Sequence, residues 1–341
     1  MLFSSNVGID LGTATVQVHL QDKGIVVNEP SVVAMEQKTK KVMAVGEEAY
    51  EMLGRTPGNI QALRPLQDGV IADFDTTESM LKHFLAKAGV RRSFVKPRVV
   101  VCVPAGITTV EQKAVIEALM RIGAREAYMI EEPRAAALGA GLDIFQPTGN
   151  MVVDIGGGTS DAAVISMGDV VVSSSVRIGG DKFNEAIERH LRKEYHLAVG
   201  ERTADELKRK IDHVEGNGRD TPLEVRGRDL IHGLPHSIQV NAREIMGAMG
   251  EPLEEIMEGV KQVLENTPPE LAGDVGSKGA ILTGGGALLS GLTEYLSREV
   301  GLAFYLAEDP INCVVTGTSK VLDNMDLLAP TLITPKKVSA R

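Results

Sequence analysis

Two short segments of the sequence combine an aspartate with a glycine-rich turn, and this pairing of residue types suits phosphate binding. Residues 7–18 contain Asp10 before one such turn, and residues 151–165 contain Asp154 before another. Glycine lacks a Cβ that would hold a ligand away, so these turns can aim successive N–H groups at a phosphate. A carboxylate at that point suits a hydrated Mg²⁺ between phosphates. The two segments together indicate a site that clamps a polyphosphate.

Both segments have the same order of residue types: apolar strand, aspartate, apolar residue, glycine turn with threonine, and a second apolar strand. This order indicates two β-hairpins related by an internal repeat. Neither turn is followed by Lys-Ser or Lys-Thr, and no G-x-G-x-x-G opens a helix, so the two common nucleotide motifs are absent. One such hairpin alone would equally fit a bulged strand, and its aspartate a turn-stabilising carboxylate. The repetition favours a ligand site.

Strands and helices must position these hairpins. An apolar run over 99–104 predicts a buried strand, and residues 110–122 predict an amphipathic helix with Val110 and Met120 on its apolar side. A strand over 127–131 leads through Glu132 and Pro133 into an alanine-rich helix, whose Gly139 and Gly141 permit close approach of another element.

The second half of the chain repeats this alternation. Asp181 is expected to cap a helix, and a polar hairpin tip is expected over 215–220. Residues 279–292 predict a strand that enters a glycine turn and then a helix. The pattern indicates a duplicated α/β core with an insertion in each half.

Composition narrows the class of protein. The 341 residues, 43% hydrophobic and 24% charged, are enough for two domains or one two-lobed body. A net charge of −10 disfavours nucleic acid as a partner. The two cysteines, Cys102 and Cys313, indicate neither a disulfide framework nor a zinc site. The first residues lack a signal-peptide pattern and no long apolar run occurs, so we expect a cytoplasmic protein that does not span a membrane.

Five motifs, in order, resemble those of the actin, heat-shock chaperone and sugar kinase superfamily. They are the two hairpins, the Glu132–Pro133 helix start, residues 283–287 and residues 314–320. Further segments, residues 23–34, 54–60, 65–73 and 178–181, resemble the bacterial actin MreB family over nearly the whole chain.

This resemblance implies an α/β, actin-like (ribonuclease H-like) duplicated fold. Each of two lobes would hold a mixed sheet flanked by helices and a small inserted subdomain, with the nucleotide in the cleft between lobes. Lobe I would span residues 1–145 with its insertion at about 30–75, and lobe II residues 146–330 with its insertion at about 180–250. Residues 331–341 would form a basic tail.

The implied function is that of a cytoskeletal ATPase with slow turnover, using ATP and Mg²⁺. It would polymerise into homopolymer filaments, as paired protofilaments, on the inner face of the cell membrane. There it would organise cell-wall synthesis and rod shape with membrane-bound morphogenesis proteins of the elongation machinery. The alternative is a small-molecule kinase or a chaperone-type ATPase of the same superfamily. No kinase substrate motif is found, and nothing after about residue 330 suits a peptide-binding domain.

Carried over residue by residue, the resemblance also implies the site. Asp10 and Asp154 would hold Mg²⁺ through water. Glu132 would orient the attacking water with help from Thr159, although Glu131 and Glu132 also fit a simple helix N-terminal charge. The phosphates would rest on backbone N–H groups at Gly12, Thr13, Ala14, Gly156, Gly157 and Gly158. The ribose and adenine would lie along Ala204, Asp205, Glu206, Leu207 and Lys208, and over Gly284, Gly285, Gly286 and Ala287.

The sequence departs from the family's usual residues in three places. Thr15-Val16-Gln17 replaces the common Asn-Thr-Leu, Asp161 stands where Glu is usual, and Arg134 is expected to pair with Glu131. Separately, residues 90–98 form a basic loop containing Phe94, which with Leu2 and Phe3 is a candidate membrane contact. An ordinary solvated loop is the alternative, since charge runs are usually surface.

Overall fold

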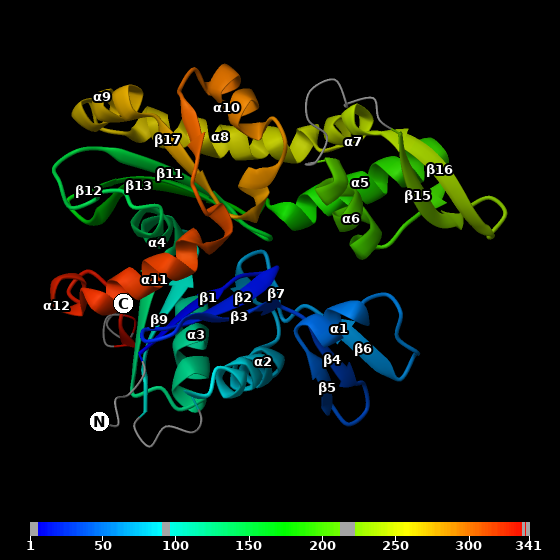
Figure 1. Cartoon of the computed structure of the whole chain (residues 1–341), viewed down its shortest axis with the longest axis horizontal. Coiled ribbons are helices and arrows are strands. Elements are labelled where there is room, and N and C mark those ends of the chain that lie inside the picture. The colour runs from blue at the N-terminus through cyan, green and yellow to red at the C-terminus, as the bar shows by residue number, and fades with distance from the viewer. Residues whose placement is uncertain (1–5, 91–95, 212–221, 336–337, 339–341) are drawn as a thin grey trace.

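The computed structural model describes residues 6–90, 96–211, 222–335 and 338. Two five-stranded sheets form its two halves, one in each lobe (Figure 1). Across the first sheet the strands are β3 (Gly24–Pro30), β2 (Thr15–Leu20), β1 (Val7–Leu11), β9 (Arg98–Val103) and β10 (Glu126–Glu131). Across the second they are β13 (Asp169–Val176), β12 (Ser160–Ser166), β11 (Asn150–Ile155), β17 (Ala280–Thr283) and β18 (Phe304–Leu306).

The two sheets have the same topology. In each, the first three strands along the chain form an antiparallel meander. A fourth strand then pairs in parallel with the first strand of the meander, and a fifth pairs in parallel with the fourth. The internal repeat predicted from the two hairpins is therefore confirmed at the level of whole sheets.

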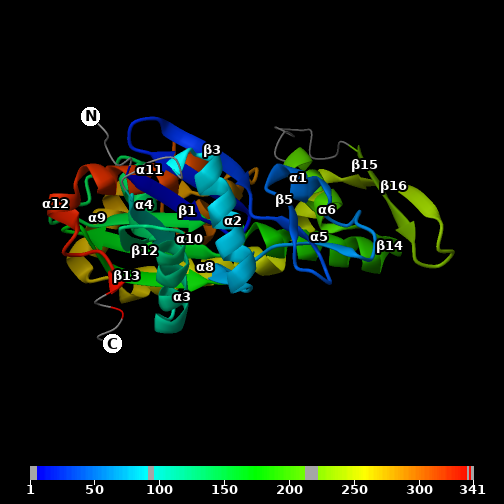
Figure 2. The ribbon, with the colours of Figure 1, turned by 90° about the horizontal axis from the view of Figure 1, so that it is seen from below.

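Successive residues of the central strands face different layers, which explains their unbroken apolar runs. On β9, Val99 and Val101 belong to the core of the first lobe, whereas Val100 and Cys102 face the layer between the sheets. Helices α2 (Phe74–Lys87) and α3 (Thr109–Arg121) cover the outer face of the first sheet. Helices α8 (Gly250–Asn266), α9 (Pro269–Lys278) and α10 (Leu292–Val300) cover the second (Figures 1 and 2).

Two helices lie between the sheets, α4 (Glu132–Gly139) and α11 (Cys313–Asp323) (Figure 1). They pack backbone to backbone, because a Cβ added at Gly139 would meet the carbonyl of Cys313, and one at Gly317 the carbonyl of Ala135. The expected close approach at Gly139 is thus confirmed. The same expectation is wrong for Gly141, which lies just after the end of the helix with a φ of +82° and has nothing within 4 Å of an added Cβ.

The end of the chain packs on the first lobe. Helix α11 contacts β1, β2 and β9, although the division expected from the sequence assigns its residues to lobe II. Helix α12 (Met325–Leu328) joins the core between the sheets. Ile333 then pairs with Met129 of β10 through two backbone hydrogen bonds, and Leu332 and Val338 are buried. The described part of residues 331–341 is therefore built into the fold and is not a free basic tail.

Each lobe carries a small additional unit, and both lie at the same end of the molecule (Figures 1 and 2). In the first lobe this unit contains β4 (Val33–Glu36), β5 (Val42–Val45), α1 (Glu47–Glu51) and β6 (Ile60–Leu63). The hairpin of β7 (Leu66–Gln67) and β8 (Val70–Ile71) that follows packs on the core of the first sheet. In the second it contains α5 (Gly180–Tyr195), β14 (Leu197–Ala198), α6 (Glu201–Ile211), β15 (Pro222–Asp229), β16 (Pro235–Asn241) and α7 (Ala242–Ala248). The hairpin tip expected over 215–220 lies outside the described residues.

Two local expectations differ from the structure. Helix α3 begins at Thr109, one residue before the expected range, and Thr108 and Glu111 form a capping box at its start, but its buried face differs from the expected one. Val110 in its first turn and Met120 in its last turn are 77% and 45% exposed, and the apolar core face consists of Val115, Ile116, Ala118 and Leu119. Asp181 does not cap α5, since Gly179 occupies the N-cap position and Asp181 lies in the first turn. Among the described residues, no helix combines the length and apolar character needed to cross a bilayer.

Candidate functional site

The two glycine turns predicted to bind phosphate lie directly against each other. The first turn joins β1 to β2, and the second joins β11 to β12. A Cβ added at Gly157 would collide with Ala14, and one added at Gly158 would collide with Thr13. Only glycine lets the second turn come this close to the first. Segments far apart in the sequence therefore form one backbone surface between the lobes.

The two aspartates occupy equivalent positions next to these turns. Asp10 lies opposite Gln17 in the first hairpin, and Asp154 lies opposite Asp161 in the second. Strand alternation turns both aspartates away from the outer cores and towards the layer between the sheets. Asp154 also accepts a 2.6 Å hydrogen bond from the hydroxyl of Thr283 at the end of β17.

Burial makes both carboxylates difficult to ionise. Burial and, secondarily, the charge of Asp154 raise the pKa of Asp10 to about 7. Burial raises the pKa of Asp154 to about 6, against the hydrogen bond from Thr283. Two acids that face one layer and have raised pKa values would be stabilised in their ionised forms by positive charge, and a hydrated divalent cation would supply it. The residues present therefore fit a Mg²⁺ held through water.

The predicted catalytic pair lies in the same place. Glu132 is the first residue of α4 and is almost fully buried, and burial followed by the charge of Asp161 raises its pKa well above the usual range. Thr159 is buried at the end of the second turn, and its hydroxyl bonds to Asp161. Asp161 is fully buried on β12 and accepts a 2.8 Å hydrogen bond from the backbone N–H of Ala105.

Sequence reasoning noted Asp161 only as a departure from a family pattern. The sequence could have indicated a role for Asp161, because it lies two residues after Thr159 at the start of a predicted strand. In a strand, residues two apart have their side chains on the same face. Burial raises the pKa of Asp161 to about 6, against hydrogen bonds from Ala105, Ser175 and Thr159. It is thus a third acid in the immediate surroundings of Glu132.

The segment Ala204–Lys208 reaches the second turn indirectly. It lies on α6, with Ala204 and Leu207 buried in the core. The Lys208 ammonium donates to the carbonyl of Gly180 at 3.0 Å and to the Asn184 side chain at 2.8 Å, and pairs with Asp205 at 3.0 Å.

The start of α5 in turn contacts the second glycine turn. The backbone N–H groups of Gly180 and Asp181 donate to the carbonyls of Gly156 and Gly157 at 3.0 and 2.8 Å. Lys208 therefore connects α6 to the second turn through α5.

The third glycine segment, residues 284–287, lies beside the second hairpin. Gly284 has a φ of +82° and leads from β17 into the short 3-10 helix η3 (Gly285–Leu288). A Cβ at Gly284 would meet the carbonyl of Ile155, which follows Asp154. This segment therefore belongs to the same region. The predicted membrane residues Leu2, Phe3 and Phe94 lie outside the described residues.

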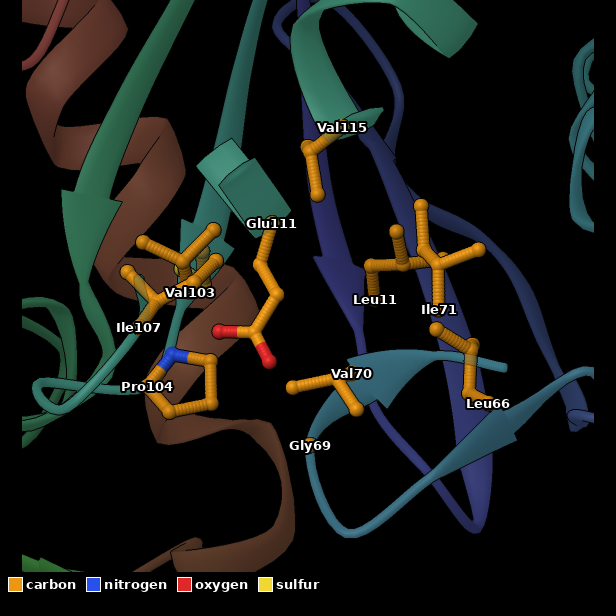
Figure 3. A pocket seen from close by; sticks show the side chains of 11 residues that line it. Leu11, Leu66, Gly69, Val70, Ile71, Val103, Pro104, Ile107, Glu111 and Val115 are labelled. Carbon is orange, nitrogen blue, oxygen red and sulfur yellow. The ribbon is translucent and has the colours of Figure 1, made fainter. Parts of the chain in front are cut away.

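A small pocket opens next to the first turn, and none of the predicted site residues lines it (Figure 3). Its walls come from the end of β1, the β7–β8 hairpin, the end of β9 and the start of α3. The lining is apolar except for Glu111, whose carboxylate points between Pro104 and Val70. Gly69 of this wall donates its N–H to the Thr13 hydroxyl at 2.9 Å. One wall of the pocket is thus hydrogen-bonded to the first turn.

Two arginines complete the surroundings. Arg134 is fully buried near the start of α4. Its Nη1 lies 3.6 Å from the Glu131 carboxylate, the pair expected from the sequence, and 3.6 Å from the Asp169 carboxylate. Its Nη2 donates a hydrogen bond to the Thr331 hydroxyl. Arg64, which no sequence pattern singled out, contacts the first turn and Glu201.

Comparisons with known proteins agree with this architecture. A protein-family model described as MreB/Mbl protein matches residues 4–330. The cell shape-determining protein Mbl of Bacillus subtilis (strain 168) is 54% identical over 327 residues, covering 96% of this chain and 98% of that protein. The cell shape-determining protein MreB of Escherichia coli (strain K12) is 50% identical over 332 residues, covering 96% and 95%.

Solved structures show the same similarity. MreB5 of Spiroplasma citri bound to AMPPNP superposes with a TM-score of 0.90 at 36% identity, covering 95% of this chain and 98% of that one. The ADP-bound form of MreB5 gives 0.91 at 36% identity, covering 97% and 99%. A MamK double helical filament gives 0.78 at 20% identity, covering 93% and 98%, which bears on the fold alone. The expected actin-like α/β fold is confirmed.

Proposed function

The chain belongs to the MreB/Mbl protein family, and from that premise we propose that it is an actin-like cytoskeletal protein that determines cell shape. In this proposal it binds ATP with Mg²⁺, hydrolyses it slowly and polymerises into filaments. The observation that carries the proposal is the contact between the two glycine turns, Gly157 against Ala14 and Gly158 against Thr13, with an aspartate before each turn.

Nucleotide binding rests on these turns. The phosphates would lie on the backbone N–H groups at residues 12–14 and 157–158, because such turns can aim successive N–H groups at an anion. The N–H of Gly156, which was expected to join them, instead donates to the carbonyl of Thr159 at 2.9 Å. The adenosine would lie along residues 204–208 and 284–287. The relative MreB5, at 36% identity, has been solved with AMPPNP and with ADP, which supports a nucleotide at the corresponding place.

Hydrolysis would depend mainly on positioning and on charge stabilisation. Asp10 and Asp154 would hold Mg²⁺ through its waters, and the ion would neutralise phosphate charge. Glu132 would orient the attacking water, and the Thr159 hydroxyl, bonded to Asp161, would help to hold it. Pro133 fixes the backbone directly after Glu132 at the first turn of α4, which restricts where this carboxyl can lie.

Replacing Glu132 tests the hydrolytic role. We expect Glu132→Ala to bind ATP but to release phosphate at least tenfold more slowly, since positioned acid–base groups contribute roughly 10²–10⁴-fold. The matched control is Glu131→Ala, which removes an adjacent acid from the same helix start. Phosphate release at the native rate by Glu132→Ala would remove Glu132 from the mechanism. If Glu131→Ala slowed phosphate release as much as Glu132→Ala does, both acids would act only as negative charges at the helix N-terminus.

Assembly and location complete the proposal. The filaments would be homopolymers of paired protofilaments lying on the inner face of the cell membrane, with membrane-bound morphogenesis proteins of the elongation machinery as partners. Leu2, Phe3 and Phe94 would contact the lipid, each weakly, so that the avidity of the polymer is needed. Co-sedimentation with anionic vesicles tests this contact, because equal pelleting of the native chain and of a variant with all three residues replaced would exclude it.

A further inference from the structure

Arg64 connects the first glycine turn to the opposite lobe. It follows β6 in the small unit of the first lobe, and its side chain is only 15% exposed. Its Nη1 donates to the carbonyl oxygens of Thr13 and Ala14 at 3.4 and 3.3 Å. Its Nε and Nη2 donate to Glu201 Oε1, at the start of α6 in the second lobe, at 2.9 and 2.7 Å.

The charges around Arg64 come from the second lobe. Burial alone would lower its pKa, but Asp181 and Glu201 outweigh burial, and the pKa is raised. The charge of Arg64 in turn opposes the effect of burial on Asp181. One guanidinium of the first lobe, itself largely buried, is therefore the counter-charge of two carboxylates of the second.

A second contact joins the same two small units, here through α1 and α6. Tyr50 lies on α1, and its hydroxyl donates a 3.4 Å hydrogen bond to Asp205 Oδ2 on α6. The Arg202 guanidinium lies over the Tyr50 ring, 5.9 Å from its centroid. These contacts join the lobes at the end of the molecule opposite α12, whereas α4 and α11 join them from within (Figure 1).

The bonds to Thr13 and Ala14 also bear on the proposed phosphate donors. The carbonyl of Thr13 and the N–H of Ala14 belong to one planar peptide group and point in opposite directions. Holding that carbonyl towards Arg64 therefore fixes the direction of the Ala14 N–H. The guanidinium thus orients the turn as well as bridging the lobes.

On the basis of the proposed nucleotide site, we propose that Arg64 is a positioning residue that orients the first phosphate turn and, through Glu201, holds the lobes together around a bound nucleotide. Release of the nucleotide then requires the Arg64–Glu201 pair to break. Neither side chain takes part in the chemical step itself.

The test is the dissociation rate of a fluorescent N-methylanthraniloyl ATP bound with Mg²⁺, chased with excess ATP in a stopped-flow instrument. We expect Arg64→Gln and Glu201→Gln each to release the nucleotide on the order of tenfold faster, the effect typical of a lost charge-assisted hydrogen bond. The double variant should be no faster than Arg64→Gln, because both substitutions break one pair. The control is Arg189→Gln, which removes a highly exposed pair with Glu251 and should release at the native rate.

The outcomes separate this inference from the function it rests on. A native chain that binds no nucleotide would overturn both. A native chain that binds nucleotide, with release unchanged in Arg64→Gln and Glu201→Gln, would overturn the role of Arg64 alone. Fully additive effects of the two substitutions would also contradict a shared pair. Should Arg64→Gln fail to fold, Glu201→Gln decides, since that side chain is 40% exposed. A merely structural role would lower the unfolding temperature without changing the release rate.

Discussion

Asp10 is the residue whose behaviour most directly reports the proposed cation. Its pKa of about 7 exceeds the value of 3.8 expected in the unfolded chain. The folded state therefore holds this proton more tightly than the unfolded state does. Its contribution to stability is fully present below pH 4 and is lost as the pH rises through about 7.

We accordingly expect the metal-free and nucleotide-free protein to become less stable between pH 5 and pH 7.5. Asp10→Asn should show a smaller loss over that interval, although Asp154 and Asp161, with pKa values of about 6, still contribute. Mg²⁺ with nucleotide should also reduce the loss, because it favours the ionised carboxylates. Urea unfolding at the two pH values measures this, and an equal loss in native protein and Asp10→Asn would contradict the assignment.

Sequence reasoning located some site residues and missed others for a physical reason. Asp10, Asp154 and the glycine turns were found because each lies in a local pattern that occurs twice. Arg64 was missed because its partners, Thr13, Ala14 and Glu201, are 50 to 137 positions away in the sequence. No local pattern marks a contact that exists only when the lobes meet.

At the scale of elements, the contact between α4 and α11 holds the layer between the sheets together. Gly317 allows it, because an added Cβ would collide with the backbone carbonyl of Ala135. A backbone atom cannot rotate away as a flexible side chain can, so one helix must shift. Small residues at this crossing are thus required by packing.

Gly317→Ala should therefore lower the free energy of unfolding by about 1–3 kcal/mol, the usual cost of overpacking. Gly276→Ala is the matched control, since it also lies within a helix, α9, but has nothing within 4 Å of an added Cβ. The control should be stabilised by about 0.5–1 kcal/mol through the higher helix propensity of alanine. Urea unfolding compares the two, and equal stability would contradict close packing at Gly317.

The helix positions themselves were largely predictable, and the errors have local causes. The apolar pattern around α3 included Val110, yet the capping box of Thr108 and Glu111 sets the helix start and leaves Val110 exposed. For Gly141, the sequence could not distinguish a packing glycine from one that ends a helix with positive φ. In both cases the hydrogen bonding of the helix end decided the outcome.

At the scale of the whole molecule, the repeat explains why two distant hairpins form one site. Each sheet carries its hairpin at the equivalent place, and the lobes face each other so that the two turns meet. The order of elements along the chain did not reveal that α11 and Ile333 return to the first lobe. Which lobe a late helix joins is decided by packing between elements far apart in sequence.

The central claim is that Mg²⁺ and ATP, bound where the two turns meet, drive assembly of this chain. Sedimentation with negative-stain electron microscopy of the purified protein, with and without anionic vesicles, tests it most directly. We predict filaments with Mg²⁺ and ATP that are lost in EDTA and in Asp154→Asn. A native protein that forms no filaments under any nucleotide or lipid condition, or forms them equally without nucleotide, would contradict the account.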